Sequence, residues 1–455
     1  MPIDFSLTPE QKTLQKVARE FAQDVLKPLV RAADAEADPQ KGFQMIRPAY
    51  EKAYELGFAT GFLPRKYGGG GLTNLDVQIA VEEIGAVDPG FGCVLLVNGL
   101  ALMPVVWFGT EAQKEKYLTE ACNDATHSYL AGWVVSEPAG TPGGTANFDH
   151  PDPRAGIQTT ADLVGDEYIV NGRKFWPSSA AGWDMKGANV NTVIVRTDRT
   201  KGGKGGLSAI LVPRGTPGVR YEPVIDKAGQ RLNQNCEIVY ENAHVPAENA
   251  FAIGNADLII SKAFTWSGPV AGIAAVGTAR SAYEYVLDWC KTYTAGGLDP
   301  IIYHQNVGYM LTDIAMRLEA CRYLCWKAAH YFDLYSVDGG QAIGAMAKIY
   351  AGEVCTQAVY DCMRVMGVNS YDRRSHPLDK YMRDVLCFPI YDAGNMGMQR
   401  RKIWGVLADP GFNPRAFVNN EPIVFTKAME GIGTVTTRPE VEPAPAQPEL
   451  VPAGD

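Results

Sequence analysis

The sequence predicts an α+β protein in which a central β domain separates two helical domains. Apolar residues recur at helical spacing in the first quarter of the chain and again after Pro246, whereas short β-rich runs fill the middle. This order of helices, strands and helices is unusual and narrows the possible folds. We expect an N-terminal helical domain, a central β domain, a C-terminal helical bundle and a disordered Pro/Glu/Ala-rich tail over residues 1–127, 128–250, 251–432 and 433–455, respectively.

The composition favours a soluble protein that acts on a small molecule. Of the 455 residues, 46% are hydrophobic and 20% are charged, which is ordinary for a globular protein. The formal net charge of −9 and the lack of a basic stripe argue against nucleic acid as a partner. The N-terminus lacks the features of a signal peptide, and no apolar run approaches the roughly 20 residues of a membrane span. We therefore expect no nucleic-acid partner and no membrane span.

The nine cysteines and six histidines show no ligand pattern. There is no C-x-x-C pair, and Cys321 and Cys325 lie four residues apart in a helical pattern, where free thiols are commoner than bridges. The histidines form no H-E-x-x-H motif. We predict a reducing, cytoplasmic location and no metal site.

The first helix is predicted from its cap. Thr8, Pro9 and Gln11 form the N-cap, the first helical position and a capping box, and apolar residues follow on one face. The run from Gly68 to Gly71 interrupts this pattern without linking a strand to a GxGxxG turn. It therefore predicts a turn and not a phosphate site, and helical spacing resumes at Val77.

Strands are predicted where β-branched and aromatic residues cluster. The runs are Tyr168–Val170, Val193–Val195, Leu207–Val212 and Ile238–Tyr240, and the Asn171-Gly172 pair after the first run predicts a hairpin turn.

Two features mark the C-terminal helices. One helix carries a continuous apolar stripe, and an earlier helix carries small residues that allow another helix to approach closely. The stripe comprises Val307, Met310, Leu311, Ile314, Leu318, Cys321 and Leu324, and the small residues are Gly272, Ala274, Ala275, Gly277, Thr278 and Ala279.

Two stretches of the predicted β domain resemble the signatures of acyl-CoA dehydrogenases. They read Trp133-Val-Val-Ser-Glu-Pro-Ala-Gly140 and Asn171-Gly-Arg-Lys-Phe-Trp176-Pro-Ser178. The resemblance covers nearly all of the chain except the tail. It implies the fold of that family, with an N-terminal helical domain, a central β-barrel-like domain and a C-terminal four-helix bundle. It also implies FAD as the cofactor, with contacts to the isoalloxazine from Trp133, Val135, Ser136, Trp176 and Ser178. An apolar, aromatic wall with a few placed donors is what such a ring requires.

A third stretch, Pro389-Ile-Tyr-Asp-Ala-Gly-Asn395, resembles the segment that bears the family's catalytic carboxylate. The resemblance implies that Asp392 is the base that removes the substrate α-proton, and it places Asn395 among the cofactor-binding residues. The family's other base position is Ser267 here, so that Asp392 has no competing carboxylate and Ser267 belongs to the catalytic site. A carboxylate suits the step because the α-proton is only weakly acidic. Desolvation by the substrate should raise the pKa of this base.

The chain departs from the family pattern at two FAD motifs. Tyr293-Thr-Ala-Gly-Gly297 replaces the R-x-x-F-G motif, and Arg364-Val-Met-Gly367-Val368 replaces Q-x-x-G-G. We predict that Arg364 and Gly367 bind the cofactor, with the Arg364 guanidinium neutralising the pyrophosphate.

These departures resemble the nitroalkane oxidase branch of the superfamily most closely. That branch also uses an aspartate base, and its active-site serine matches Ser267. The arginine that it places seven residues after the base is Gln399 here, although Arg400 and Arg401 follow directly.

Two reactions are therefore predicted, and the lost arginine favours the first. In the first, an acyl-CoA, which we expect to carry a cyclic or otherwise unusual acyl group, is oxidised to its α,β-enoyl form, with an electron-transfer protein or oxygen as the acceptor. In the second, a nitroalkane is oxidised and nitrite is released. A flavin monooxygenase would need a pocket without the Asp392 base, and a non-enzymatic interaction protein would bind no flavin. The resemblance further implies a homotetramer.

Overall fold

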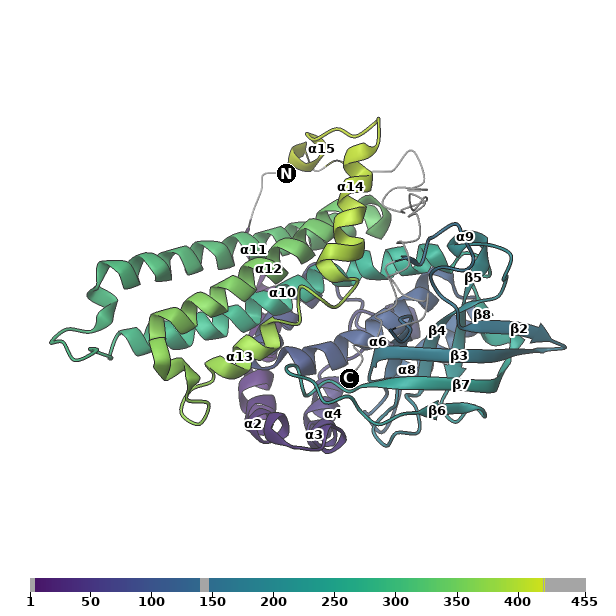
Figure 1. Cartoon of the computed structure of the whole chain (residues 1–455), viewed down its shortest axis with the longest axis horizontal. Coiled ribbons are helices and arrows are strands. Elements are labelled where there is room, and N and C mark those ends of the chain that lie inside the picture. Colours follow the sequence, from purple (N-terminus) through teal and green to yellow (C-terminus); the bar gives the residue numbers. More distant parts are fainter. Residues whose placement is uncertain (1–4, 140–146, 420, 422–455) are drawn as a thin grey trace, which may run out of the picture.

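The computed structural model describes residues 5–139, 147–419 and 421. Long helices lie side by side at one end of the molecule and a β-sheet lies at the other, with the N-terminal helices between and below them (Figure 1). Helix α10 (Ala256–Cys290) joins the two ends, because its first turns contact strand β5 (Leu207–Pro213) and its later turns lie in the helical bundle. The predicted order of helices, sheet and helices is confirmed. The predicted tail over 433–455 lies outside the described residues.

The N-terminal helices begin as their caps predict. Helix α1 (Pro9–Glu20) has Thr8 as its N-cap, and the capping box with Gln11 is present. The glycine run after Tyr67 forms a turn, as predicted, in which the Gly71 amide donates to the Leu63 carbonyl at 2.9 Å. The other elements of this region are η1 (Phe21–Leu26), α2 (Lys27–Ala35), α3 (Pro39–Met45), α4 (Arg47–Glu55), η2 (Arg65–Tyr67), α5 (Asn74–Val87), α6 (Pro89–Phe108), α7 (Glu111–Gln113), η3 (Lys114–Leu118) and α8 (Thr119–Cys122).

Helices α6 and α10 have the length and the apolar composition that would allow a helix to cross a membrane. The expectation that no apolar run approaches that length is therefore wrong for α6, which has 20 residues. In the most apolar window of each helix, 61% of α6 and 89% of α10 are buried inside the protein. Burial of this extent is typical of the core helices of a globular fold.

The sheet follows the strand order β6, β7, β3, β2, β4, β5, β8, and β1 pairs in parallel with β4. The four predicted strand runs are confirmed within β3, β4, β5 and β7. The strands are β1 (Ala131–Val134), β2 (Thr160–Val164), β3 (Glu167–Ser178), β4 (Val190–Arg196), β5, β6 (Val219–Tyr221), β7 (Asn235–Pro246) and β8 (Ala250–Phe251), with the short α9 (Gly203–Gly206) between β4 and β5 and η5 (Ala247–Asn249) before β8.

The predicted turn at Asn171-Gly172 is wrong, because β3 continues through both residues. The register with β7 shifts between Val170 and Gly172, which marks a bulge and not a chain reversal. Gly172 has φ +142°, and a Cβ there would lie 2.8 Å from the Thr159 Cα. The glycine therefore permits a bend and a close approach within the strand.

The C-terminal helices pack closely through small residues, as predicted. A Cβ at Gly272 of α10 would lie 2.9 Å from the Cys325 Sγ of α11 (Gln305–Gly339), and one at Gly277 would lie 2.3 Å from the Glu82 carbonyl oxygen of α5. The elements of this region are η6 (Ile301–Tyr303), α11 (Gln305–Gly339), α12 (Gln341–Met366), η7 (Gly367–Tyr371), α13 (Leu378–Val385), η8 (Gly394–Gln399), α14 (Arg400–Ala408) and α15 (Ala416–Asn419).

Gly277→Ala tests this close approach between α10 and α5. The added Cβ would meet backbone atoms of Glu82 and Ala86, which cannot rotate aside, so we expect the free energy of unfolding to fall by about 1–3 kcal/mol. Gly308→Ala on α11 is the control, because a Cβ there meets nothing within 4 Å. The control should be neutral or stabilising in the same denaturant titration, since alanine has the higher helix propensity. Equal losses in both variants would contradict the packing described here.

Candidate active site

Asp392 lies in the turn between α13 and η8, where its backbone has φ +51°. A left-handed conformation is uncommon for a residue other than glycine, although aspartate tolerates it better than most. The turn directs the carboxylate toward α10, where the Ser267 hydroxyl donates to Asp392 Oδ1 at 2.6 Å. The other oxygen, Oδ2, is buried and has no hydrogen-bond partner among the described residues. The structure thus brings together the two predicted catalytic residues and leaves one carboxylate oxygen free to accept a proton.

The pKa of Asp392 is raised above its ordinary value, chiefly because burial removes water from the carboxylate. The positive charge of Lys348, the Ser267 hydrogen bond and the charge of Lys402 all act in the opposite direction. Desolvation therefore raises the pKa of Asp392, and three neighbours limit this rise because they favour the ionised carboxylate.

Lys348 of α12 is buried and holds the turn that carries Asp392. Its Nζ donates to the Tyr391 carbonyl oxygen and to Asn395 Oδ1, both at 2.9 Å, and also to the Phe388 carbonyl oxygen. Burial lowers the pKa of Lys348 to about 8. Its charge lies beside the backbone of the base, and its three acceptors are all neutral.

Lys402 of α14 is a second buried lysine near the base. Its Nζ donates to the Ser261 carbonyl oxygen and to Thr265 Oγ1, each at 3.0 Å, and burial lowers its pKa to about 7. The sequence analysis missed both lysines. For Lys348 a signal was present, since it is the only charged residue in the segment Gln341–Gly352 of a predicted helix.

Gln399 occupies the position where the nitroalkane oxidase branch has its arginine. Its Nε2 donates to the Asp392 carbonyl oxygen at 3.1 Å and to the Phe264 carbonyl oxygen at 3.5 Å. Arg400 and Arg401 do not replace the lost charge, because they pair with Glu353 at 2.8 Å and with Asp149 at 2.7 Å.

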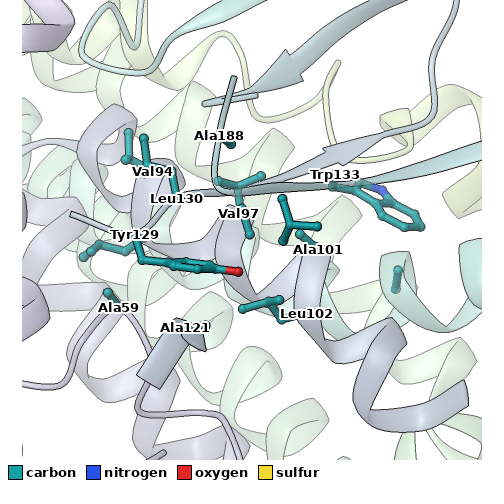
Figure 2. Close-up of a cluster of buried hydrophobic side chains, with 14 of the residues drawn as sticks. Ala59, Val94, Val97, Ala101, Leu102, Ala121, Tyr129, Leu130, Trp133 and Ala188 are labelled. Carbon is teal, nitrogen blue, oxygen red and sulfur yellow. The ribbon is translucent and has the colours of Figure 1, made fainter. Parts of the chain in front are cut away.

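Phe264 connects the base to an aromatic wall. It lies one helical turn before Ser267 on α10, and its ring meets Trp133 edge to face with 6.3 Å between centroids. Trp133 is on β1, at the edge of the buried cluster that includes Tyr129 and Leu130 (Figure 2). Its Nε1 is buried, and no described residue hydrogen-bonds to it. The wall therefore presents an indole N–H donor beside Phe264.

The two sequence motifs meet through the backbone. The Phe175 amide of β3 donates to the Ser136 carbonyl oxygen at 2.8 Å, and Val135 is buried with its carbonyl oxygen accepting from Lys174 Nζ at 2.9 Å. Trp176 follows with φ +71° and a side chain that is 51% exposed. A positive φ at a tryptophan is a strained backbone conformation, and such conformations cluster at functional sites.

Ser178 completes this group at the end of β3. Its Oγ accepts from Asn233 Nδ2 at 3.0 Å and from Asn235 Nδ2 at 3.2 Å. These residues fit an isoalloxazine, because the unpartnered Trp133 indole N–H and the uncovered Trp176 face supply a donor and an aromatic surface.

The other three predicted cofactor residues lie elsewhere in the bundle, and their contacts with FAD stay predictions. Arg364 is exposed and pairs with Asp361 at 3.0 Å. Gly367 ends α12 with φ +65° and ψ −150°, a conformation almost restricted to glycine. Asn395 is buried, and both ends of its amide have partners, among them Lys348 and the Ile349 carbonyl oxygen. Within the described ranges, no group of three His, Cys, Asp or Glu side chains is placed to hold a metal ion.

Comparison with known proteins matches three parts of the chain in order. Residues 8–124, 152–243 and 258–407 match the N-terminal, middle and C-terminal domains of acyl-CoA dehydrogenases. The Fusarium oxysporum nitroalkane oxidase is 31% identical over 434 residues, which are 91% of this chain and 97% of that protein. The mitochondrial short-chain specific acyl-CoA dehydrogenase of Mus musculus is 30% identical over 88% of this chain and 90% of its own length.

Solved structures show the same similarity to nitroalkane oxidases and acyl-CoA dehydrogenases. A nitroalkane oxidase, an active-site aspartate-to-asparagine mutant crystallized with 1-nitrooctane, is 30% identical with a TM-score of 0.85, covering 91% of this chain and 99% of that one. The butyryl-CoA dehydrogenase of Megasphaera elsdenii is 27% identical with a TM-score of 0.77, covering 89% and 100%. The predicted fold is confirmed by these matches.

Ser267→Ala tests how the base is tuned. Since the pKa of Asp392 is already raised, the ionised base accumulates only as the pH rises through that value. Removing the hydroxyl removes a donor that favours the carboxylate, so the acidic limb of the kcat/KM profile should move to higher pH. At pH values below this limb, kcat/KM of the variant should be about tenfold lower than that of the wild-type protein, because hydrogen bonds to charged groups contribute about 1.5–3 kcal/mol.

Ser281→Ala on the same helix is the matched control. Its hydroxyl donates to the Ala86 carbonyl oxygen at 2.6 Å, far along α10 from Asp392. The control should keep the original pH profile. An unmoved limb in Ser267→Ala would show that the hydrogen bond does not set the ionisation of the base.

Proposed function

The chain belongs to the acyl-CoA dehydrogenase family and is an FAD-dependent oxidoreductase, and we propose that its substrate is a nitroalkane or a carbon acid of similar acidity. One observation carries the proposal, the 2.6 Å hydrogen bond from Ser267 to a desolvated Asp392. Two nitroalkane oxidase structures support it. They are an active-site aspartate mutant and an active-site serine mutant, each crystallized with a nitroalkane.

The strength of the base favours a relatively acidic carbon. General base catalysis works best when the pKa of the base approaches that of the carbon acid. The Ser267 hydroxyl and two buried lysines oppose the rise in the pKa of Asp392, so the base is weaker than an equally buried carboxylate without them. An α-proton beside a nitro group is more acidic than one beside a thioester. The restrained base therefore suits the nitroalkane better.

Positive charge at the site supports the same choice. The family branch uses an arginine seven residues after the base, and Gln399 cannot supply that charge. Lys402 and Lys348 are buried lysines whose charges act on Asp392. We propose that they take over the electrostatic part of the missing arginine's role by favouring the ionised base and the negative charge that forms on the substrate.

Each residue of the site then has one task. Asp392 accepts the α-proton at Oδ2, while Ser267 holds Oδ1 in place. Lys348 fixes the turn beneath the base. Trp133, Trp176 and Ser178 would hold the isoalloxazine of bound FAD. When bound, FAD supplies the acceptor for the electron pair that the deprotonated substrate releases.

An acyl-CoA substrate is the second candidate, and the sequence favoured it. The Mus musculus dehydrogenase and a probable acyl-CoA dehydrogenase of Bacillus subtilis are each 30% identical to this chain over 88% of its length. The chain also has Gln399 where the nitroalkane oxidase branch has an arginine, and this difference favours the acyl-CoA candidate. For the nitroalkane, we also propose molecular oxygen as the electron acceptor and a homotetrameric assembly. For an acyl-CoA, an electron-transfer protein would accept the electrons.

Anaerobic reduction of the bound flavin separates the two substrates. We expect nitroethane and 1-nitrohexane to bleach the visible flavin absorbance of the purified holoenzyme, with nitrite released in step with flavin reduction and turnover continuing once oxygen returns. Asp392→Asn should slow this bleaching by about 10²–10⁴-fold, the usual contribution of a general base. Asp372→Asn, an exposed aspartate outside the site, is the control and should reduce its flavin at the original rate. Bleaching by butyryl-CoA or other CoA esters alone would overturn the proposal in favour of the dehydrogenase.

A further inference from the structure

Lys227 lies beside the proposed flavin site, in the loop between β6 and β7. Its Nζ donates to Asn235 Oδ1 at 2.6 Å and also to the Asn233 carbonyl oxygen. Both asparagines are buried. The ammonium therefore contacts the same two residues whose amides reach Ser178.

The lysine determines which way the Asn235 amide faces. An ammonium group can only donate hydrogen bonds, so the oxygen of Asn235 must face Lys227 and its nitrogen must face the opposite side. On that side Nδ2 donates to the Trp176 carbonyl oxygen at 2.7 Å and to Ser178 Oγ at 3.2 Å. Exchanging the two ends of the amide would place a carbonyl oxygen against the Trp176 carbonyl oxygen and an NH₂ group against an ammonium.

The orientation of Asn233 follows from that of Asn235. Asn233 Nδ2 lies 3.4 Å from Asn235 Oδ1 and 3.0 Å from Ser178 Oγ. An oxygen at the first of these positions would face another oxygen, so the nitrogen is kept there. Ser178 Oγ consequently receives two N–H donors.

These two donors determine the direction in which the Ser178 hydroxyl donates its own hydrogen bond. A hydroxyl has two lone pairs and one proton, and here both lone pairs are occupied. The Ser178 proton must be donated away from the asparagines. We propose that Lys227 is a positioning residue that makes Ser178 an obligatory hydrogen-bond donor to the flavin ring, acting through Asn233 and Asn235.

The inference rests on the proposed place of the isoalloxazine beside Ser178, and not on the identity of the substrate. A fixed donor at the ring stabilises the negative charge that reduction places there. It should therefore hold FAD more tightly and make the flavin easier to reduce. Because the donor is set before binding, no reorganisation is needed when electrons arrive.

The experiment measures FAD binding and the flavin midpoint potential without substrate. Lys227→Met should weaken FAD binding about tenfold, the equivalent of one hydrogen bond, and should move the potential to a more negative value. Ser178→Ala should act in the same direction. Lys227→Met in the Ser178→Ala background should add little, because the lysine acts through the hydroxyl.

Two further variants make the outcome decisive. Asn235→Asp keeps an acceptor for Lys227 but removes the donor to Ser178, so it should reproduce the effect if Lys227→Met does not fold. Lys186→Met, an exposed lysine of the same domain, should leave both measurements unchanged.

Two results would contradict the inference in different ways. If Lys227→Met has its full effect in the Ser178→Ala background, the lysine acts directly by its charge, and the relay is wrong. If Ser178→Ala changes neither FAD binding nor the potential, Ser178 does not contact the ring, and the proposed placement of the cofactor fails as well.

Discussion

The site depends on a carboxylate that is kept away from water beside one hydroxyl donor. Burial raises the pKa of Asp392, and in the part of the chain that the structure describes only the Ser267 hydroxyl donates a hydrogen bond to its carboxylate. Desolvation alone would leave the base neutral over a wide pH range, whereas a direct ion pair would make it too weak to remove a proton from carbon. Buried Lys348 and Lys402 supply positive charge without bonding to the carboxylate. Burial and these two charges oppose each other, so that Asp392 can ionise and still accept a proton from carbon.

The fold supplies this arrangement from three directions. Helix α10 carries Ser267 and, one turn earlier, Phe264. The turn before η8 carries Asp392 in a left-handed conformation that Lys348 of α12 holds by two neighbouring carbonyl oxygens. The sheet adds Trp133, whose ring contacts Phe264. Close packing of α10 through small residues makes these positions rigid, because interiors packed at this density cannot shift freely.

The sequence predicted what local patterns encode, namely the order of helices and strands, the cap at Thr8, the small-residue helix and the proximity of Ser267 to Asp392 that the family resemblance implied. It missed features that depend on tertiary structure. Asn171-Gly172 has the composition of a turn, but pairing of β3 with β7 extends the strand through it as a bulge. Lys402 and Lys227 look like ordinary surface lysines in the sequence, and only the folded chain shows that Lys402 is buried and Lys227 partly buried, each beside polar groups.

Asp392 is proposed to remove a proton from the substrate carbon as the flavin is reduced. The most direct measurement compares the anaerobic rate of flavin reduction by nitroethane with the rate by nitroethane deuterated at the carbon that bears the nitro group. We expect reduction to be several-fold slower for the deuterated substrate, since breaking this C–H bond is the step that the base assists. Equal rates for the two substrates, with Asp392→Asn as fast as the wild-type protein, would contradict it.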